Sequence, residues 1–336
     1  MSAHPRITVV IPAFQAEARI GRTLMRLQHQ TYRDFEVVVV NDGSTDRTSD
    51  VVRQAMRADA RIRLVEQSNG GIAAARNRGI EAAQGSALAF LDDDDLWHPD
   101  KLALQLARLE SVPRSAVVSC LSVLVDADGR LLGWRLGGTP EGNVYREMLE
   151  WDMISGGSVA LVAREPLEEA GGFDASLPDR ADWDLWIRMA RLHPFTSVPR
   201  ALVGYTRRAG SVSQSYDRMI EHGRRVLEKA RRADPAIGDA DHGAYMARDL
   251  FGAACLCLVD ERTRLAWRYA WRALETGPAM ILGQPRRWGV MLMLTLASAL
   301  PRQIYRDGPL AIMSRTAFGL QAGAPFDSLG SESLDL

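Results

Sequence analysis

Short apolar runs and segments of helical periodicity alternate along roughly the first third of the chain. The runs are rich in β-branched residues and lack polar alternation, which is typical of strands buried on both faces. The expected strands are Ile7–Phe14, Phe35–Val40, Ile62–Val65 and Ala87–Leu91, and the expected helices are Ala18–Gln28, a segment from Thr48, Gly71–Gln84 and a segment opened by Pro99. This β-α order predicts an α/β fold, with a mostly parallel sheet and helices on both faces.

The pattern changes after Ala116. Two apolar runs, Ala116–Val125 and Leu131–Leu136, flank a short Asp- and Gly-containing turn and predict a hairpin. The later segments predict extended stretches at Ser158–Arg164 and Phe195–Tyr205, a helix at Asp182–Arg191, and further helices at Asp217–Arg232, Gly243–Val259, Arg262–Glu275 and Arg287–Leu300. We therefore expect an α/β domain over 1–212, with halves at about 5–112 and 113–212. A helical region over 213–320 and a disordered tail over 321–336 would follow.

Composition limits the classes of protein that the chain can represent. Its 336 residues are 46% apolar and 25% charged, which is ordinary for a globular protein. Basic and acidic residues nearly balance, 41 against 42, which argues against a nucleic-acid partner. The three cysteines cannot form a disulfide framework and favour a cytoplasmic location. No targeting signal and no run long enough to span a bilayer is visible.

The glycine-rich phosphate-binding motifs are missing from the sequence. The turn after the first strand, Ile11–Glu17, has no G-x-G-x-x-G, and no P-loop motif occurs in the chain. A diphosphate would therefore need another partner. A divalent cation held by carboxylates, Mg²⁺ or Mn²⁺, is the obvious one.

An acidic run, Asp92–Asp95, directly follows the expected strand Ala87–Leu91. Four adjacent carboxylates repel one another unless a cation or hydrogen-bond donors relieve them. The alternative is an acidic cluster at a helix N-terminus, ahead of Pro99. Ligands of parallel sheets bind beyond the carboxyl ends of the strands, and this favours a metal and diphosphate site.

Three further residues have both a structural and a functional interpretation. Asp42 ends the second strand and either belongs to a capped turn or accepts hydrogen bonds from a nucleobase or ribose. Arg76 follows a glycine turn and either reaches a phosphate or is solvated, and spacing alone favours solvation. Asp182 opens a helix beside two tryptophans, and either caps that helix or acts as a general base from which water is excluded.

Taken together, the chain resembles the family 2 glycosyltransferases of the GT-A fold. The resemblance covers about residues 5–210 and leaves the C-terminal third uncovered. It rests on five motifs in the family's order, ITVVIPAFQAEARI (7–20), VVVVNDGSTDRT (37–48), NGGIAAARNRGIEAAQG (69–85), LAFLDDDDLWHPDKL (88–102) and GGFDASLPDRADWDLWIRMA (171–190).

The resemblance implies roles for individual residues. The positions that it places at the nucleotide or substrate are Pro12, Ala13, Glu17, Asp42, Arg76, Asp92 and Asp93. Asp92 and Asp94 fall on the D-x-D positions, with Asp94 as the ligand of the metal and Asp92 directed to the ribose or a metal-bound water. Asp182 matches the catalytic base. An inverting transfer needs only this base and a cation for the departing diphosphate.

The implied reaction moves one sugar from a UDP-, dTDP- or GDP-sugar to a glycan or lipid-linked acceptor, in bacterial cell-surface polysaccharide or glycolipid synthesis. Ala181 stands where the family often has Glu, which leaves the acceptor open. Gln284–Trp288 spells the Q-x-x-R-W of processive members but lies outside the resembling region, and we interpret it as coincidence. The alternatives are a sugar nucleotidyltransferase, whose glycine-rich first loop is not found here, and a non-catalytic sugar- or nucleotide-binding module.

One C-terminal segment has three interpretations. Trp288–Leu300 carries no charge, and no acidic residue occurs between 286 and 306, although arginines flank the segment. It is too short to span a bilayer. Peripheral docking on anionic lipid at the inner face of the cytoplasmic membrane, a buried core helix and a homodimer contact are all compatible with this pattern.

Overall fold

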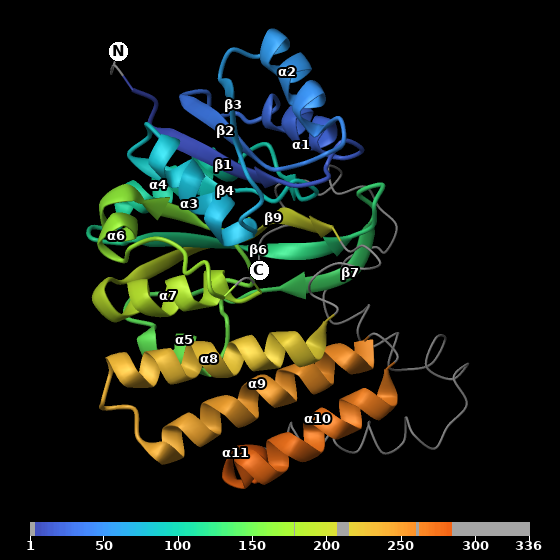
Figure 1. Cartoon of the computed structure of the whole chain (residues 1–336). Coiled ribbons are helices and arrows are strands. Elements are labelled where there is room, and N and C mark those ends of the chain that lie inside the picture. Colours follow the sequence, from blue (N-terminus) through green and yellow to red (C-terminus); the bar gives the residue numbers. More distant parts are fainter. Residues whose placement is uncertain (1–3, 178, 207–214, 260–261, 284–336) are drawn as a thin grey trace. The chain divides into compact units, whose positions relative to one another are not determined.

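The computed structural model describes residues 4–177, 179–206, 215–259 and 262–283 (Figure 1). These residues form two compact units. The first contains residues 4–145 and 152–206, and the second contains 146–151 and 215–283. The segment 146–151 lies inside the expected α/β domain in sequence but packs with the second unit. The expected boundary near 212 and everything after 283 lie outside the described residues.

A nine-stranded sheet forms the centre of the first unit (Figure 1). Its order is β3-β2-β1-β4-β8-β6-β9-β5, and β7 pairs with β6. The strands are β1 (Ile7–Ala13), β2 (Phe35–Asp42), β3 (Ile62–Gln67), β4 (Ala87–Phe90), β5 (Leu96–Trp97), β6 (Val117–Val125), β7 (Leu131–Leu136), β8 (Leu161–Ala163) and β9 (Phe195–Thr206).

The sheet has a parallel half and a mixed half. Strands β3, β2, β1 and β4 are parallel, whereas β8 runs antiparallel to both β4 and β6. β6 and β7 form the expected hairpin, and Gly129 adopts a positive φ of 81° in its turn. The predicted α/β fold is therefore confirmed, and the sheet is mixed beyond β4. The two-residue β5 has no counterpart among the expected strands.

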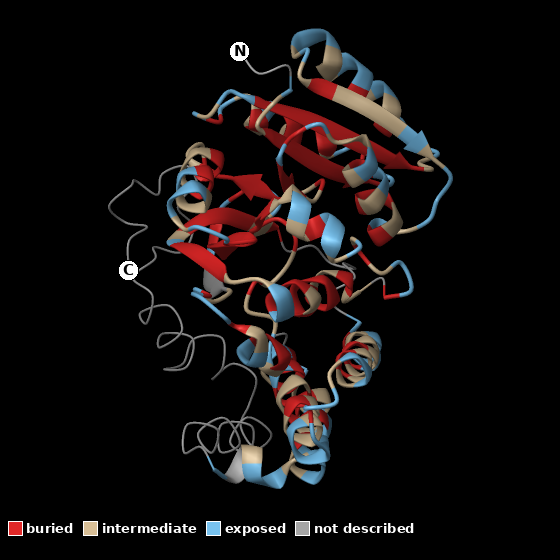
Figure 2. Cartoon of the chain, turned by 90° about the vertical axis from the view of Figure 1, so that its left-hand side faces the viewer, coloured by how far each residue is buried: buried red, intermediate tan, exposed pale blue. Residues whose placement is uncertain are grey.

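Helices pack on this sheet, and its central strands are buried, whereas only Ile62 of the edge strand β3 is (Figure 2). The helices of the first unit are α1 (Ile20–Leu27), α2 (Thr48–Ala58), α3 (Ile72–Ala82), α4 (Lys101–Ser111), α6 (Arg164–Glu169) and α7 (Ala181–Leu192). The alanine-rich α3 packs against β1 and β2. A Cβ atom at its Gly79 would lie 2.2 Å from Val10 Cγ1, so this contact requires glycine. α4 packs against β6 and β9.

α4 carries a fully buried lysine. The Nζ of Lys101 donates to Gln105 Oε1 at 2.7 Å and lies 3.8 Å from the centre of the Trp97 ring. Burial lowers the pKa of Lys101 to about 8. Between that value and the ordinary lysine pKa of about 10.4, the unfolded chain holds a proton that the native protein has released. The unfolding free energy should therefore rise with pH across this window.

We expect Lys101→Met to remove part of that rise. Urea midpoints at pH 7.5 and 10 measure this rise, and Lys229→Met is the matched control because the chain has no other lysine. If the urea midpoint of Lys101→Met changes between the two pH values as much as that of the wild type does, the lowered pKa of Lys101 is contradicted.

The second unit is helical. It contains α5 (Tyr145–Glu150) from residue 146, α8 (Tyr216–Ala233), α9 (Asp239–Val259), α10 (Thr263–Thr276) and α11 (Pro278–Leu282). Tyr269 lies in its core and donates from its hydroxyl to Asp217 Oδ1 at 2.6 Å. Arg248 of α9 pairs with Glu150. Among the residues with a described structure, no helix is long and apolar enough to cross a membrane.

Candidate functional site

The carboxyl ends of β1, β2 and β4 lie side by side, because these strands are parallel neighbours. Ala13 pairs with Asn41 at the end of β2, and Val10 pairs with Phe90 at the end of β4. The segments that follow these strands therefore meet at one edge. They are the turn after β1, the turn that begins at Asp42, and the acidic run.

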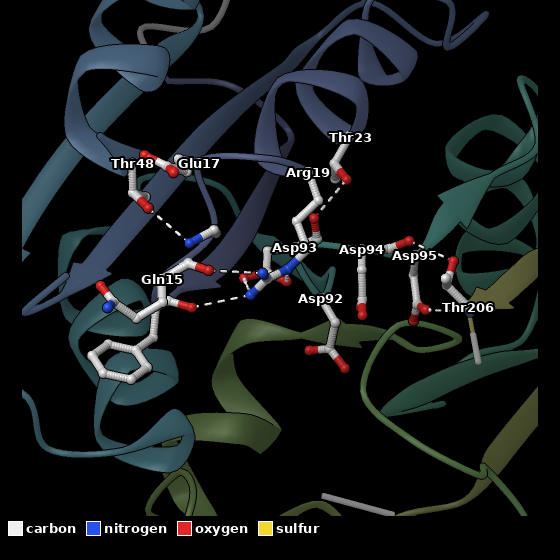
Figure 3. Close-up of polar contacts among 12 residues, drawn as sticks. Gln15, Glu17, Arg19, Thr23, Thr48, Asp92, Asp93, Asp94, Asp95 and Thr206 are labelled. Atoms are coloured by element: carbon white, nitrogen blue, oxygen red, sulfur yellow. Dashed lines mark hydrogen bonds and ion pairs between the residues drawn. The ribbon is translucent and has the colours of Figure 1, made fainter. Parts of the chain in front are cut away.

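Hydrogen bonds join the turn after β1 to the start of α2 (Figure 3). The Gln15 N–H donates to Ser44 Oγ at 3.0 Å, and the Ala16 N–H donates to Thr48 Oγ1 at 2.8 Å. The Glu17 carboxylate accepts the Arg47 N–H at 2.9 Å. Pro12 and Ala13 are buried within β1. Glu17 therefore fixes the turn in this structure, and the nucleotide-bordering role of Pro12, Ala13 and Glu17 stays a prediction.

The Asp42 carboxylate organises the loop before α3. Its Oδ1 accepts from Gln67 Nε2 at 2.7 Å and from the Gly70 N–H at 2.8 Å, and its Oδ2 accepts from the Gly71 N–H at 2.8 Å. Asp42 is only 3% exposed. Its described partners are protein groups, so its contact with a base or ribose stays a prediction.

Successive side chains of the acidic run point in different directions (Figure 3). Asp93 points to Arg19, the residue directly before α1, whereas Asp92 and Asp94 extend away from Arg19 on a common side. Asp95 accepts the Thr206 N–H at 3.0 Å. Thr206 Oγ1 also donates to the Asp94 carbonyl at 2.6 Å, so the end of β9 supports the run. No sequence motif singled out Thr206.

Asp95 is buried, and its Oδ2 has no hydrogen-bond partner in the part of the chain that the structure describes. Burial and the neighbouring charges of Asp92 and Asp94 raise its pKa well above the ordinary value. The crowding expected from four adjacent carboxylates is therefore present in the fold.

Arg76 is buried, although its spacing alone favoured a solvated side chain. Its Nη2 donates to Asp92 Oδ1 at 2.7 Å, and its guanidinium lies 5.3 Å from the centre of the Phe173 ring. Burial by itself lowers the pKa of Arg76, but the charges of Asp92, Asp182 and Asp95 outweigh it and raise the pKa above its ordinary value. This buried cation therefore lies among carboxylates from two distant parts of the sequence.

Asn77, the next residue of α3, orders the approach to α7. Its side chain donates to the Phe173 carbonyl at 2.8 Å and accepts the Phe173 N–H at 2.8 Å. Gly172 adopts a positive φ of 69°, and a Cβ there would lie 2.8 Å from Asn77 Oδ1. The glycine pair before Phe173 thus allows this docking, and α3 holds both Arg76 and the segment that leads to Asp182.

Asp182 lies in the first turn of α7 and is partly exposed. The exclusion of water from Asp182 by its flanking tryptophans stays a prediction. Trp183 and Trp186 are almost completely buried in the core. The next carboxylate, Asp184, is buried and pairs with Arg188 at 2.7 Å, so it is structural.

A second carboxylate, which the sequence analysis missed, interacts electrostatically with Asp182. Asp152 follows α5, and its Oδ1 accepts the N–H groups of Ile154 and Ser155, each at 3.1 Å. Burial and the charge of Asp182 raise the pKa of Asp152 to about 7. The sequence carried no signal for it, because an Asp before a glycine-containing turn is common.

This raised pKa makes stability depend on pH. Between pH 4 and pH 7 the native Asp152 keeps a proton that the unfolded chain has lost, so the unfolding free energy should fall as pH rises. Asp152→Asn should remove that fall, and urea midpoints at pH 5 and pH 8 measure it. Asp126→Asn is the matched control, since Asp126 Oδ1 also accepts two backbone N–H groups. If the urea midpoints of both variants change equally between pH 5 and pH 8, the raised pKa of Asp152 is contradicted.

The residues of the acidic run fit a divalent cation that is shared with a diphosphate. Among the described residues, no group of three or more His, Cys, Asp or Glu side chains could hold a metal by itself. Mg²⁺, however, commonly takes only one or two carboxylates together with substrate phosphates. Asp92 and Asp94 extend to a common side, where they could share such a cation with a diphosphate.

Known proteins with similar sequences carry glycosyltransferase names. Residues 8–169 match the model of glycosyl transferase family 2. A putative teichuronic acid biosynthesis glycosyltransferase, TuaG of Bacillus subtilis, is 41% identical over 103 residues, which is 30% of this chain and 41% of that protein. The first four curated relatives are matched over 26% to 41% of their own lengths.

Two solved structures with a similar fold are complexes with nucleotide sugars. S. aureus TarS 1–349 in complex with UDP-GlcNAc superposes with a TM-score of 0.59 at 21% identity, over 92% of this chain and 87% of that one. The mannosyltransferase PcManGT from Pyrobaculum calidifontis, in complex with GDP-Man and Mn²⁺, gives 0.60 at 23% identity, over 94% and 87%. The predicted GT-A fold is thereby confirmed, and residues 8–169 form a domain of glycosyl transferase family 2.

Proposed function

We propose that the protein is an inverting, metal-dependent glycosyltransferase that moves one sugar from a nucleoside-diphosphate sugar to an acceptor hydroxyl. The observation that carries this proposal is the position of Arg76. This buried cation pairs with Asp92 of the acidic run and interacts electrostatically with Asp182 of α7. A carboxylate suited to a metal–diphosphate and a carboxylate suited to a base thus share one site.

The donor would bind across the ends of β1, β2 and β4. The nucleoside would lie along the turn after β1, where the ring of Phe14 is 47% exposed and offers a face for base stacking. The diphosphate would face Asp92 and Asp94. Asp94 would ligate a divalent cation, Mg²⁺ or Mn²⁺, whose charge would stabilise the departing diphosphate. Arg76 would keep Asp92 oriented, since it leaves that carboxylate one oxygen for the donor.

Asp182 would accept the proton of the acceptor hydroxyl as that oxygen attacks the sugar carbon. A single displacement inverts the configuration and needs no covalent intermediate on the protein. Asp152 would hydrogen-bond the acceptor beside Asp182, with the role that the family often gives to the residue at Ala181. The acceptor class is a glycan or a lipid-linked sugar of a bacterial cell-surface polymer, in line with the teichuronic acid relative. Cytoplasmic location, membrane docking and a homodimer stay predictions, because residues 286–306 lie outside the described part.

A donor screen tests this function. The whole chain is incubated with UDP-, dTDP- and GDP-sugars in Mn²⁺, Mg²⁺ or EDTA, and the release of nucleoside diphosphate is measured. We expect release from one donor that requires a metal. Pyrophosphate formation from a nucleoside triphosphate and a sugar phosphate would instead establish a nucleotidyltransferase. Failure of the folded protein to bind any donor would contradict the proposal and leave a non-catalytic module.

A further inference from the structure

The middle residue of the D-x-D segment, Asp93, has an unexpected partner. Its Oδ1 accepts from Arg19 Nε at 2.7 Å, and its Oδ2 accepts from Arg19 Nη2 at 2.9 Å (Figure 3). The two side chains are 11% and 24% exposed. Paired parallel hydrogen bonds of this kind fix both the distance and the orientation of the two groups. Asp93 is therefore held on the side of the acidic run opposite to Asp92 and Asp94.

The same guanidinium binds the turn after β1. Arg19 Nη1 donates to the Gln15 carbonyl at 2.7 Å, and Nη2 donates to the Phe14 carbonyl at 3.0 Å. Thr23 Oγ1, one turn further along α1, donates to the Asp93 carbonyl at 2.9 Å. One arginine thus cross-links the turn on which the nucleoside would lie and the run that would hold the metal and diphosphate.

The turn held in this way is strained. Gln15 adopts a φ of 48°, which is uncommon for a residue other than glycine. Such a conformation persists only where the surroundings fix it, and strained residues are concentrated at ligand sites. Besides Arg19, the Ser44 hydroxyl and the Thr45 N–H hold Gln15. Loss of Arg19 would release two carbonyls of this turn and leave the Asp93 carboxylate without its bidentate partner beside further negative charges.

We propose that the Arg19–Asp93 ion pair couples the binding of the divalent cation to the binding of the nucleotide, as a pair of positioning residues. The proposal rests on the proposed function. A cation on Asp94 favours one arrangement of the run, and Arg19 transmits that arrangement to the carbonyls of Phe14 and Gln15. Coupling between two sites is reciprocal, so each ligand must raise the affinity for the other by the same factor. The pairing also removes Asp93 as a competing ligand of the cation.

The coupling is measurable without turnover. Calorimetry of the whole chain gives the Kd of the nucleoside diphosphate (UDP, dTDP or GDP, as the screen selects) with Mn²⁺ and with EDTA. The ratio of the two constants is the coupling factor. Paramagnetic resonance titrations of Mn²⁺, with and without nucleotide, must give the same factor. We expect Arg19→Gln and Asp93→Asn to lower it about tenfold each, within the usual range of coupling between sites.

Three variants separate this role from a general loss of stability. The Arg19→Gln, Asp93→Asn double variant should be no worse than either single variant, because both remove the same link. Arg19→Lys keeps the positive charge but loses the two parallel N–H groups of the guanidinium, so it should lower the coupling factor as much as Arg19→Gln does. Arg78→Gln, which removes an exposed ion pair with Glu81 on α3, should keep the wild-type factor. Melting temperatures show which variants are folded, and Asp93→Asn decides the outcome where Arg19→Gln does not fold.

The outcomes distinguish this inference from the proposed function. An unchanged coupling factor in a folded Arg19→Gln or Asp93→Asn variant would overturn the inference, and so would additive losses in the double variant. Nucleotide binding to the wild type that Mn²⁺ does not affect would overturn it as well. If the wild type binds no nucleoside diphosphate with or without metal, it is the proposed function that fails.

Discussion

Replacing Asp182 by Asn is expected to lower sugar transfer at least about a hundredfold while leaving donor affinity unchanged. The amide has nearly the same shape as the carboxylate but cannot accept the proton of the acceptor hydroxyl, and general-base catalysis of this kind contributes roughly 10²–10⁴-fold. Donor binding should persist, because the residues proposed to hold the nucleotide and the diphosphate lie on other segments. The measurement is the rate of transfer to an acceptor, together with the Kd of the intact donor.

The neighbouring Asp184 offers a contrast to Asp182. It is buried and paired with Arg188 of the same helix. Asp184→Asn should therefore lower the melting temperature, while the protein that remains folded keeps its transfer rate. Asp182, which is partly exposed, should show the opposite pattern. A fully active Asp182→Asn variant would remove this residue from the catalytic role. Equal losses of donor affinity and of rate would assign it to donor binding instead.

Asp94→Asn is expected to weaken Mn²⁺ binding and to reduce transfer by on the order of a hundredfold or more, since a metal supplies several kcal/mol of charge stabilisation at a leaving group. An amide oxygen is a poorer ligand for a hard cation than a carboxylate. Paramagnetic resonance of Mn²⁺ in the presence of nucleoside diphosphate measures the affinity separately from the rate. Excess Mn²⁺ should restore part of the activity.

Asp128→Asn is the control for this change. It also removes one acidic charge from the first unit, but Asp128 lies in the exposed β6–β7 turn, where it forms a salt bridge with Arg130. Its metal affinity and transfer rate should equal those of the wild type. If Asp94→Asn binds Mn²⁺ as tightly as Asp128→Asn does, the metal lies elsewhere. In that case Asp92 becomes the next candidate, because it extends to the same side.

Much of the first unit could be predicted from sequence because its signals are local. The continuous apolar run at Phe35 predicts a strand buried on both faces, and β2 is buried along its whole length. Pro99 indicated the start of a helix, and α4 begins two residues later. The two-residue β5 and the short α5 and α6 were missed, because such short segments carry too little periodicity to be recognised.

The sequence by itself determined the α/β class, the strand ends that carry Asp42 and the acidic run, and the family to which residues 8–169 belong. These follow from hydrophobic periodicity and ordered motifs, which are properties of neighbouring residues. Only the tertiary structure decided which way each acidic side chain points. It turned Asp93 to Arg19, buried Arg76 between Asp92 and Asp182, and brought Asp152 to Asp182. Burial and pairing between residues distant in sequence depend on how the strands and helices pack, and no local pattern encodes that.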